Sequence, residues 1–444
     1  MNKAYHKPLR GQSAEVFIES LTQDGRGVAH IDGKAIFIHG ALPGETVRFT
    51  YNKIQKRFDE GTVQEILTAA PKRVLPKCPH FGICGGCSLQ HLETTAQIQA
   101  KEQILRDALV HIGKVQPQSG YLPPLVAKHW GYRRKARLGV RYVERKGQLL
   151  VGFRERGSSF ITNMQSCQVL HPKLGMHIIA LRETLASLSI CKQIPQVEMA
   201  MGDTSCILVI RVLAAPSTAD RLKLSQFAYI HDMHIYLQTG GPQQVEPLDK
   251  TAHLGYSIPE LGLSLEFEPL DFTQVHLELN QLLITRVLEL LNPQNNSHIL
   301  DLFCGIGNFT LPLATCSNRV VGVEGDAGLV ARAKNNAVTN GLNNCEFFTT
   351  DLYKELDLTT APWLQQTFSQ IVLDPPRSGA LQLLPHLPKL NAQQLLYISC
   401  LPATLARDAE ILVHELGYTL DVAGVMDMFP HTAHVESIAL FTRN

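Results

Sequence analysis

The pattern of hydrophobic and polar positions changes along the chain. Between residues 11 and 69, short runs such as residues 14–19 and 45–51 alternate apolar and polar positions, and Asp-Gly and Pro-Gly pairs separate them. Alternation with a period of two is typical of half-buried strands, and five such runs predict a small barrel of the OB type. Residues 94–113 instead repeat their apolar positions with a helical period.

Strand-like and helical stretches alternate from residue 271 onward. Apolar runs at residues 298–303, 319–324, 370–374 and 394–400 suit parallel strands that are buried on both faces. The alternation predicts a doubly wound parallel sheet that ends in two antiparallel strands, near residues 418–426 and 435–442. We therefore expect an α/β protein with three parts: an OB-like β-barrel over residues 8–70, a central α+β domain over residues 71–270 and a Rossmann-like domain over residues 271–444.

A loop with two glycines follows the first buried strand of the last domain. Gly305 and Gly307 would let backbone N–H groups approach a ligand closely. Glu324 ends the next strand and is a natural partner for two ribose hydroxyls. The loop departs from the G-x-G-x-x-G dinucleotide pattern, because Phe309 and Thr310 stand near the place of its third glycine. We expect S-adenosylmethionine as the cofactor; a tight turn without any ligand is the alternative.

Three reactive side chains are expected at strand ends of the same domain. Cys400 directly follows a strand and precedes a probable helix over residues 402–416, whose N-terminus would stabilise a thiolate. Asp374 lies in a loop stiffened by two prolines, and Glu436 is the only acid near its turn. Thiolate addition to C6 of uracil makes C5 nucleophilic toward a methyl donor, and a base must then remove the C5 proton. We assign Cys400 as the nucleophile, Glu436 as the base and Asp374 as support for the pyrimidine or cofactor; a buried strand-end cysteine is the alternative.

Charge is distributed unevenly between the two ends of the chain. Residues 1–270 contain 32 Lys and Arg against 23 Asp and Glu, whereas residues 271–444 contain 9 against 17. This asymmetry suggests a polyanion that one part binds and another modifies, although a basic face can also be merely solvated. The candidate RNA-binding residues are Lys53, Lys56, Arg57, Arg133, Arg134, Arg137 and Arg141, the last four interleaved with Tyr132 and Tyr142.

Cysteine spacing indicates a metal centre in the central domain. Cys78, Cys84 and Cys87 form a C-x5-C-x2-C arrangement in a glycine-rich loop, and thiolates at this spacing suit an iron–sulfur cluster or zinc. Cys167 is our choice for the fourth ligand, because other cysteines nearby lie in apolar runs. The spacing of radical enzymes, C-x3-C-x2-C, is absent at this site, so a structural role is expected.

Targeting signals are not evident in the sequence. The first residues contain no apolar segment of a signal peptide, and no stretch approaches 18 consecutive apolar residues. We expect a cytoplasmic protein without a membrane partner.

Four motifs together resemble the RNA 5-methyluridine methyltransferase family: residues 301–309, 374–380, 397–407 and 429–436. The barrel resembles the RNA-binding TRAM module through residues 24–29 and 40–45. The resemblance implies a class I methyltransferase domain that uses S-adenosylmethionine, with the nucleophile at Cys400 and the base at Glu436. It implies cofactor contacts at Gln274, Phe303, Asn308, Glu324, Asp351 and Asp374, and a [4Fe-4S] cluster on Cys78, Cys84, Cys87 and Cys167.

The combination of modules implies a branch within this family. Members that act on the tRNA T-loop look like the catalytic domain alone, and one ribosomal-RNA branch has the cluster without TRAM. A chain with both resembles the branch that methylates C5 of a 23S rRNA uridine, at the position numbered 1939, with the base flipped out and no obligate protein partner. The alternatives are a dual-site or tRNA uridine methyltransferase, and a cluster-bearing RNA-binding or redox-sensing protein without catalysis. Two residues depart from the family pattern, Leu401 and His276, both where Asn is usual.

Overall fold

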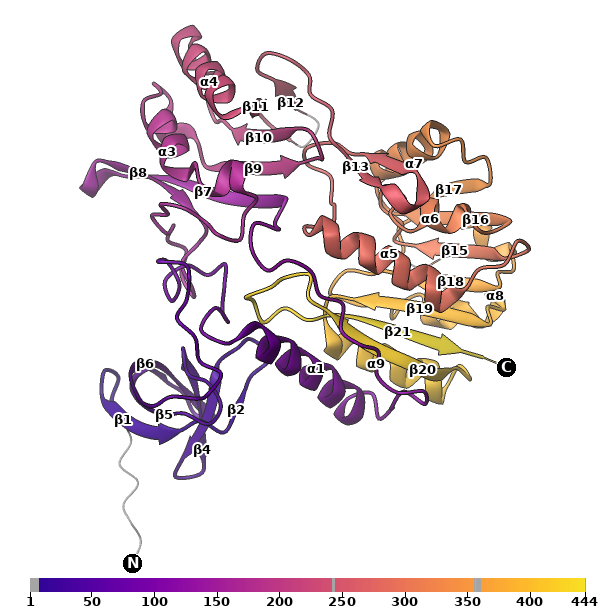
Figure 1. The fold of residues 1–444 in the computed structure, drawn as a ribbon, viewed down its shortest axis with the longest axis horizontal. Coiled ribbons are helices and arrows are strands. Elements are labelled where there is room, and N and C mark those ends of the chain that lie inside the picture. The colour runs from indigo at the N-terminus through magenta and orange to yellow at the C-terminus, as the bar shows by residue number, and fades with distance from the viewer. Residues whose placement is uncertain (1–7, 242–243, 355, 357–360, 444) are drawn as a thin grey trace, which may run out of the picture. The chain divides into compact units, whose positions relative to one another are not determined.

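The computed structural model describes residues 8–241, 244–354, 356 and 361–443, and Figure 1 traces their fold. The chain forms two compact units. The first contains the N-terminal residues as far as Lys101 together with Arg154–Thr162 and Phe429–His434; the second contains Glu102–Phe153, Asn163–Met428 and Val435–Asn444. Helix α1 (Thr94–His111) begins in the first unit and ends in the second. No helix among the described residues is long and apolar enough to cross a membrane.

A six-stranded sheet forms most of the first unit. Its strands are β1 (Ser13–Phe17), β2 (Ser20–Leu21), β3 (Gly27–Ile31), β4 (Lys34–His39), β5 (Thr46–Ile54) and β6 (Phe58–Thr68), in the order β1-β5-β6-β4-β3-β2. Ile36 and Ile38 of β4 are buried whereas Phe37 between them is only partly so, as the alternating sequence predicts. The register of β5 against β6 shifts three times, and such irregularities bend strands around a small core.

A second six-stranded sheet belongs to the second unit. Its strands are β7 (Lys135–Val143), β8 (Gln148–Gly152), β9 (Gln196–Met201), β10 (Cys206–Arg211), β11 (His234–Gln238) and β12 (Val245–Pro247), in the order β12-β11-β10-β9-β7-β8. Between them lie α2 (Pro172–Gly175), α3 (Ile178–Ala186), α4 (Thr218–His231) and the 3-10 turns η1 (Glu144–Lys146) and η2 (Cys191–Gln193). Helix α3 packs on β8, and α4 packs on β11 and α3.

The C-terminal part contains a hairpin and a seven-stranded sheet. The hairpin joins β13 (Gly255–Ile258) and β14 (Leu263–Glu266) through η3 (Pro259–Leu261). The sheet contains β15 (His298–Leu302), β16 (Arg319–Glu324), β17 (Cys345–Thr349), β18 (Gln370–Leu373), β19 (Gln394–Ser399), β20 (Thr419–Met426) and β21 (Glu436–Thr442). Its helices are α5 (Leu277–Leu291), α6 (Thr310–Ala314), α7 (Ala327–Thr339), α8 (Leu387–Leu390) and α9 (Pro402–His414), with η4 (Pro362–Gln365) and η5 (Leu384–His386).

Strand order in this sheet confirms the doubly wound prediction. The order is β17-β16-β15-β18-β19-β21-β20; the first five strands are parallel, and β21 pairs antiparallel with both neighbours. Every residue of β18 is buried, which accounts for its continuous apolar run. The parallel strands end on the same edge, so the loops that follow β15, β16, β18 and β19 lie together there.

Candidate active site

Strand register brings the predicted catalytic residues together. The last pair between β19 and β21 joins Ser399 to Ser437, which places Cys400 beside Glu436 at the edge of the sheet. Asp374 follows β18, the parallel neighbour of β19. Residues more than sixty positions apart along the chain therefore meet at one edge.

Glu324 organises the glycine loop. One of its oxygens, Oε2, accepts a hydrogen bond from the N–H of Gly305 at 3.2 Å, and Oε1 accepts from the N–H groups of Gly325 and Asp326 at 2.6 and 3.1 Å. The backbone of Gly307 has a φ of +93°, and a Cβ there would come within 2.4 Å of the Leu311 side chain. These constraints explain both the left-handed turn and its glycine.

Asn308 lies in an amide cluster that the sequence pattern did not reveal in full. Its side chain exchanges two hydrogen bonds with the side chain of Asn280, at 2.8 and 3.0 Å, and its Oδ1 also accepts from the Tyr256 hydroxyl at 2.8 Å. Tyr256 comes from the hairpin strand β13, and no sequence spacing signals this contact. These contacts fix the side chain of Asn308 within the loop that follows β15.

The other predicted cofactor residues lie in loops at the same edge. Asp351 is exposed; a hydrogen bond from the Tyr353 N–H at 3.1 Å and the Lys354 ammonium at 3.2 Å lower the pKa of its carboxyl. The ring of Tyr353 lies 5.7 Å from that of Phe303, and burial, Glu324 and Cys400 raise the pKa of its hydroxyl. Sequence reasoning missed Tyr353, whose only signal is its place in the loop after a strand.

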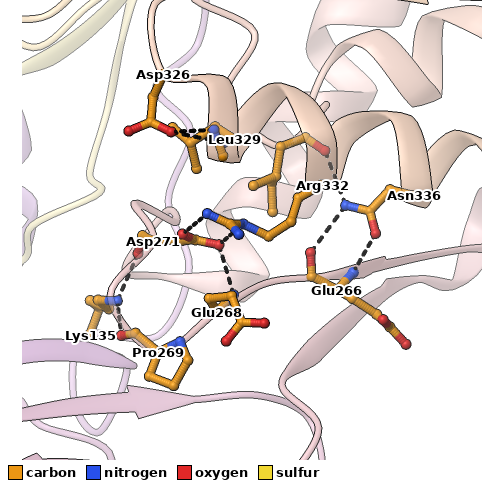
Figure 2. A network of polar contacts seen from close by, with 11 residues as sticks. Lys135, Glu266, Glu268, Pro269, Asp271, Asp326, Leu329, Arg332 and Asn336 are labelled. Carbon is orange, nitrogen blue, oxygen red and sulfur yellow. Dashed lines mark hydrogen bonds and ion pairs between the residues drawn. The ribbon is translucent and has the colours of Figure 1, made fainter. Parts of the chain in front are cut away.

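Gln274 belongs to a segment that a polar network anchors to helix α7 (Figure 2). Asn336 of α7 exchanges hydrogen bonds with the backbone of Glu266 at 2.9 and 3.1 Å, and Arg332 forms an ion pair with Asp271. Lys135 donates to the Asp271 carbonyl at 2.7 Å, and burial lowers the pKa of Lys135 to about 8. The network holds the segment that leads to Gln274.

The environment of Cys400 corrects one expectation. We expected the helix N-terminus to favour a thiolate, but burial and the carboxylates of Glu436 and Asp374 raise the pKa of Cys400 to about 11. Helix α9 begins with Pro402, which has no N–H to direct at the sulfur. Burial and two nearby acids therefore outweigh the helix end, and the thiol is protonated in the free protein.

Two aspartates at the same edge are also poor acids. Burial and the nearby Glu436 raise the pKa of Asp374 to about 8. Burial is the largest cause that raises the pKa of Asp301 to about 7, although the Thr310 hydroxyl donates to it. Asp374 therefore carries a proton at neutral pH in the free protein and is a hydrogen-bond donor there.

The two departures from the family pattern leave the local structure intact. His276 is buried and caps helix α5, because its Nδ1 accepts from the Leu279 N–H at 3.4 Å while Nε2 lies 2.8 Å from the Lys128 carbonyl oxygen. This cap starts the helix at Leu277. Leu401 occupies the N-cap of α9, and the Ser399 hydroxyl accepts its N–H at 3.2 Å.

The cysteines are distributed over both units. Cys84 is buried, accepts a hydrogen bond from the Gly86 N–H at 3.4 Å and lies close enough to Cys78 for that thiol to raise its pKa. Cys78 and Cys87 are half-buried in the same loop, whereas Cys167 belongs to the second unit. Within the described ranges, no group of three or more His, Cys, Asp and Glu side chains is arranged to hold a metal ion.

The predicted RNA-binding residues belong to both units and differ in their exposure. Lys53, Lys56 and Arg57 are exposed on the β5–β6 hairpin, and Arg137 and Arg141 are exposed on β7. Arg134 forms an ion pair with Asp203 at 2.8 Å, and Arg133 donates to the Lys135 carbonyl at 2.9 Å. The ring of Tyr132, which lies between these arginines in the sequence, is buried and stacked on His276 and so is not available to stack on an RNA base.

Comparisons with known proteins agree with this geometry. Residues 260–444 match the family model described as tRNA (Uracil-5-)-methyltransferase, and residues 7–63 match the TRAM domain. The N-terminal module and the C-terminal methyltransferase fold are thereby confirmed. The fold is also similar to that of the crystal structure of Pyrococcus abyssi tRNA (uracil-54, C5)-methyltransferase in complex with S-adenosyl-L-homocysteine, with a TM-score of 0.73 at 21% identity over 96% of this chain and 99% of that one.

Two relatives are similar over nearly their whole length. The chain is 52% identical to a protein of Nitrosococcus oceani named 23S rRNA (uracil(1939)-C(5))-methyltransferase RlmD, over 98% of this chain and 97% of that protein. It is 49% identical to the protein of the same name from Methylococcus capsulatus, over the full length of both. The chain therefore belongs to the RlmD family of 23S rRNA (uracil(1939)-C(5))-methyltransferases.

Proposed function

We propose that this protein transfers a methyl group from S-adenosylmethionine to C5 of a uridine in 23S rRNA, at the position numbered 1939. The observation that carries the proposal is the meeting of Cys400, Glu436 and Asp374 at one sheet edge, in a chain half identical to relatives of that name. Ribosomal RNA is made in the cytoplasm of bacteria, so we place the protein there.

The side chains at the sheet edge support a covalent mechanism. The Cys400 thiol releases its proton to solvent and its sulfur bonds to C6 of the uracil, which makes C5 nucleophilic, so that C5 can bond to the transferred methyl group. S-adenosylmethionine, when bound, supplies an electrophilic methyl group. Protonated Asp374 would donate a hydrogen bond to a uracil carbonyl oxygen as negative charge develops on it. Glu436 then takes the C5 proton, the bond between carbon and sulfur breaks, and the Cys400 sulfur leaves with its electron pair.

The cofactor residues are proposed in two groups. Gly305, Gly307, Phe303 and Asn308 line the loop after β15, where backbone groups face the edge of the sheet. Gln274, Glu324, Asp351 and Asp374 add polar side chains around it. Calorimetric titration with S-adenosylmethionine tests this assignment, and unchanged affinity in Asp351→Ala would remove that residue from the site.

Two variants test the covalent mechanism in purified protein. Cys400→Ala should abolish methylation of a 23S rRNA fragment and leave its binding unchanged, since the sulfur is needed only for chemistry. Glu436→Gln should accumulate a protein–RNA adduct that survives denaturing electrophoresis, because proton removal frees the thiol. The matched control is Cys316→Ala, because Cys316 is a half-buried cysteine outside the site. Turnover by Cys400→Ala would exclude the mechanism.

The target is tested in cells. Mass spectrometry of ribosomal RNA with and without the gene should show the loss of one 5-methyluridine from 23S rRNA. Loss of two would indicate a dual-site enzyme, loss from tRNA alone a tRNA enzyme, and no loss the binding protein without catalysis.

We also propose that Cys78, Cys84, Cys87 and Cys167 hold a [4Fe-4S] cluster with a structural role. Support comes from the all-thiolate donor set, the loop that carries three of the four cysteines, and the Gly86 N–H donated to the Cys84 sulfur. Protein purified without oxygen should contain about four iron atoms and four acid-labile sulfides per chain. Cys84→Ser should lose them and the control Cys191→Ser should not; one zinc ion per chain would instead indicate the zinc alternative.

We propose, further, that exposed cations bind the RNA backbone. Lys53, Lys56, Arg57 and Arg141 carry this role by their exposure. Arg137 is also exposed, but its guanidinium group already pairs with Glu198 at 3.0 Å. Arg133 and Arg134 contribute less, because protein groups already engage their guanidinium groups.

A further inference from the structure

The loop that precedes Glu436 packs in the first unit although its flanking strands belong to the second. Strand β20 ends at Met426 and β21 begins at Glu436, and residues 429–434 between them are counted with the N-terminal residues. His431 is buried and has a φ of +67°, in the left-handed region that favours glycine. A conformation of this kind persists only where its surroundings hold it.

The segment directly after the cysteine loop holds His431 through its backbone. The N–H groups of Ser88 and Leu89 donate to the His431 carbonyl at 3.0 and 2.9 Å, and the Ala433 N–H donates to the Ser88 hydroxyl at 2.9 Å. Ser88 is the residue after Cys87. The cysteine loop is thus joined directly to the loop that leads into Glu436.

Helix α1 supplies the other side of this contact. Its buried Gln97 accepts the His431 N–H at 2.9 Å with its Oε1, and its Nε2 donates to the carbonyls of Leu89 and Leu92 at 3.0 and 2.7 Å. The side-chain amide of Gln97 therefore bonds both to His431 and to the segment that contains Leu89 and Leu92. Buried Lys101, one turn further along, donates to the Phe429 carbonyl at 3.1 Å.

A turn of the barrel packs against the same two segments. Gly25, in the turn before β3, has a φ of +79°, and a Cβ there would lie 3.1 Å from the Leu89 side chain and 3.3 Å from that of Ala433. This close packing explains a glycine of the turn that resembles TRAM sequences. Barrel, cysteine loop and helix α1 thus converge on one loop.

We propose that Ser88, Leu89 and Gln97 form a clasp on residues 429–434 that positions Glu436 to remove the C5 proton. The inference rests on the function proposed above. Glu436 lies three residues beyond Ala433, so a loop that moves carries the carboxylate with it. The clasp residues do not touch the substrate; they are positioning residues, and their effect falls on the step that Glu436 performs.

Two substitutions open the clasp without replacing any catalytic residue. Gln97→Met keeps the size of the side chain but removes its four hydrogen bonds, including one of 3.3 Å between Nε2 and His431 Nδ1. Ser88→Ala removes the acceptor for the Ala433 N–H. Gln103→Met is the matched control, because Gln103 lies on the same helix and its exposed side chain bonds to Asp107. Thermal melting identifies variants that fail to fold, and Ser88→Ala decides the test if Gln97→Met does not fold.

The expected result is specific to the last chemical step. Both variants should lower kcat by about 10- to 100-fold with KM nearly unchanged, as a misplaced catalytic group does. They should also accumulate the denaturation-resistant protein–RNA adduct, which a general loss of structure would not produce. Wild-type turnover, or reduced turnover without adduct, would overturn the clasp.

Glu436→Gln, measured in parallel, separates this proposal from the one on which it rests. If that variant accumulates adduct and the clasp variants do not, the clasp alone is wrong. If Glu436→Gln itself forms no adduct, the assignment of the base is wrong, and the clasp falls with it.

Discussion

Cys400 illustrates how the surroundings of a single residue set its chemistry. Burial and, after it, the neighbouring carboxyl groups of Glu436 and Asp374 raise the pKa of Cys400 to about 11. In the free protein the site therefore holds a protonated thiol and not a reactive thiolate. In the proposed mechanism the proton therefore leaves Cys400 only when its sulfur attacks the uracil.

Removing one of these carboxylates should make the thiol more reactive. Glu436→Gln should lower the pKa of Cys400, because the negative charge that opposes the thiolate is lost. The rate of iodoacetamide labelling of Cys400 at mildly alkaline pH, followed by peptide mass spectrometry, should exceed that of the wild type. Glu410→Gln is the control, since Glu410 is paired with Lys114 away from the site. Equal labelling rates would show that Glu436 does not set the acidity of the thiol.

Asp374 should make the free protein less stable as the pH rises. The pKa of Asp374 is raised to about 8 in the folded state, so the folded protein binds more protons than the unfolded one between about pH 4 and about pH 8. Stability therefore falls with increasing pH across that range. Asp374→Asn should flatten the decline measured by chemical denaturation at several pH values, whereas Asp107→Asn should not. A decline of undiminished slope in Asp374→Asn would contradict the prediction.

At the scale of elements, helix α7 serves as an anchor for the segment before α5. Arg332 and Asn336 are one helical turn apart and bind Asp271 and the backbone of Glu266 (Figure 2). Lys135 reaches the same segment from β7. Three elements that are distant in the sequence thus fix the approach to Gln274.

Loss of the anchor should weaken both the fold and the cofactor site. Arg332→Met leaves the buried Asp271 carboxylate without its partner and should lower the free energy of unfolding by about 1.5–3 kcal/mol. It should also weaken binding of S-adenosylmethionine in calorimetry, since Gln274 follows three residues later. Lys334→Met, at an exposed position of the same helix, should change neither quantity. If Arg332→Met binds S-adenosylmethionine with wild-type affinity, the network does not support the cofactor site.

At the scale of the whole molecule, charge is distributed unevenly between the first 270 residues and the C-terminal part. The cations of the first 270 residues suit a polyanion, whereas the acidic C-terminal part holds Cys400, Asp374 and Glu436. The β5–β6 hairpin adds three exposed cations, Lys53, Lys56 and Arg57. No ion pair involves these three among the described residues, so their charge is available to phosphates.

Replacing these three residues by Ala should change the salt dependence of RNA binding. Each lost contact with a single-stranded phosphate lowers the slope of log K against log salt by about 0.7, so the triple variant should lose up to about 2. Methylation at saturating RNA should stay unchanged. Lys72→Ala is the control, because Glu93 already compensates that charge at 3.0 Å. An unchanged slope in the triple variant would place the RNA elsewhere.

Local pattern predicted most of the elements and singled out the candidate reactive groups. Alternating runs predicted the barrel strands, and buried apolar runs predicted the parallel sheet, because both patterns record which faces meet water. Cys400, Glu436 and the glycine loop stood out because strand ends are where such sheets place ligands. Caps are less visible: the start of α5 at Leu277 depends on a histidine that acts as N-cap.

Contacts between distant segments could not be read from the chain. Four features of the structure depend on residues that are far apart in the sequence. They are the raised pKa of Cys400, the stacking of Tyr132 on His276, the hydrogen bonds among Tyr256, Asn280 and Asn308, and the hydrogen bonds of Ser88 and Gln97 to the loop at His431. Sequence period reports whether a residue faces the core, and not which partner it meets there. Electrostatics and hydrogen bonding depend on that partner, so the fold alone settles the protonation of the thiol and the anchoring of the loop before the base.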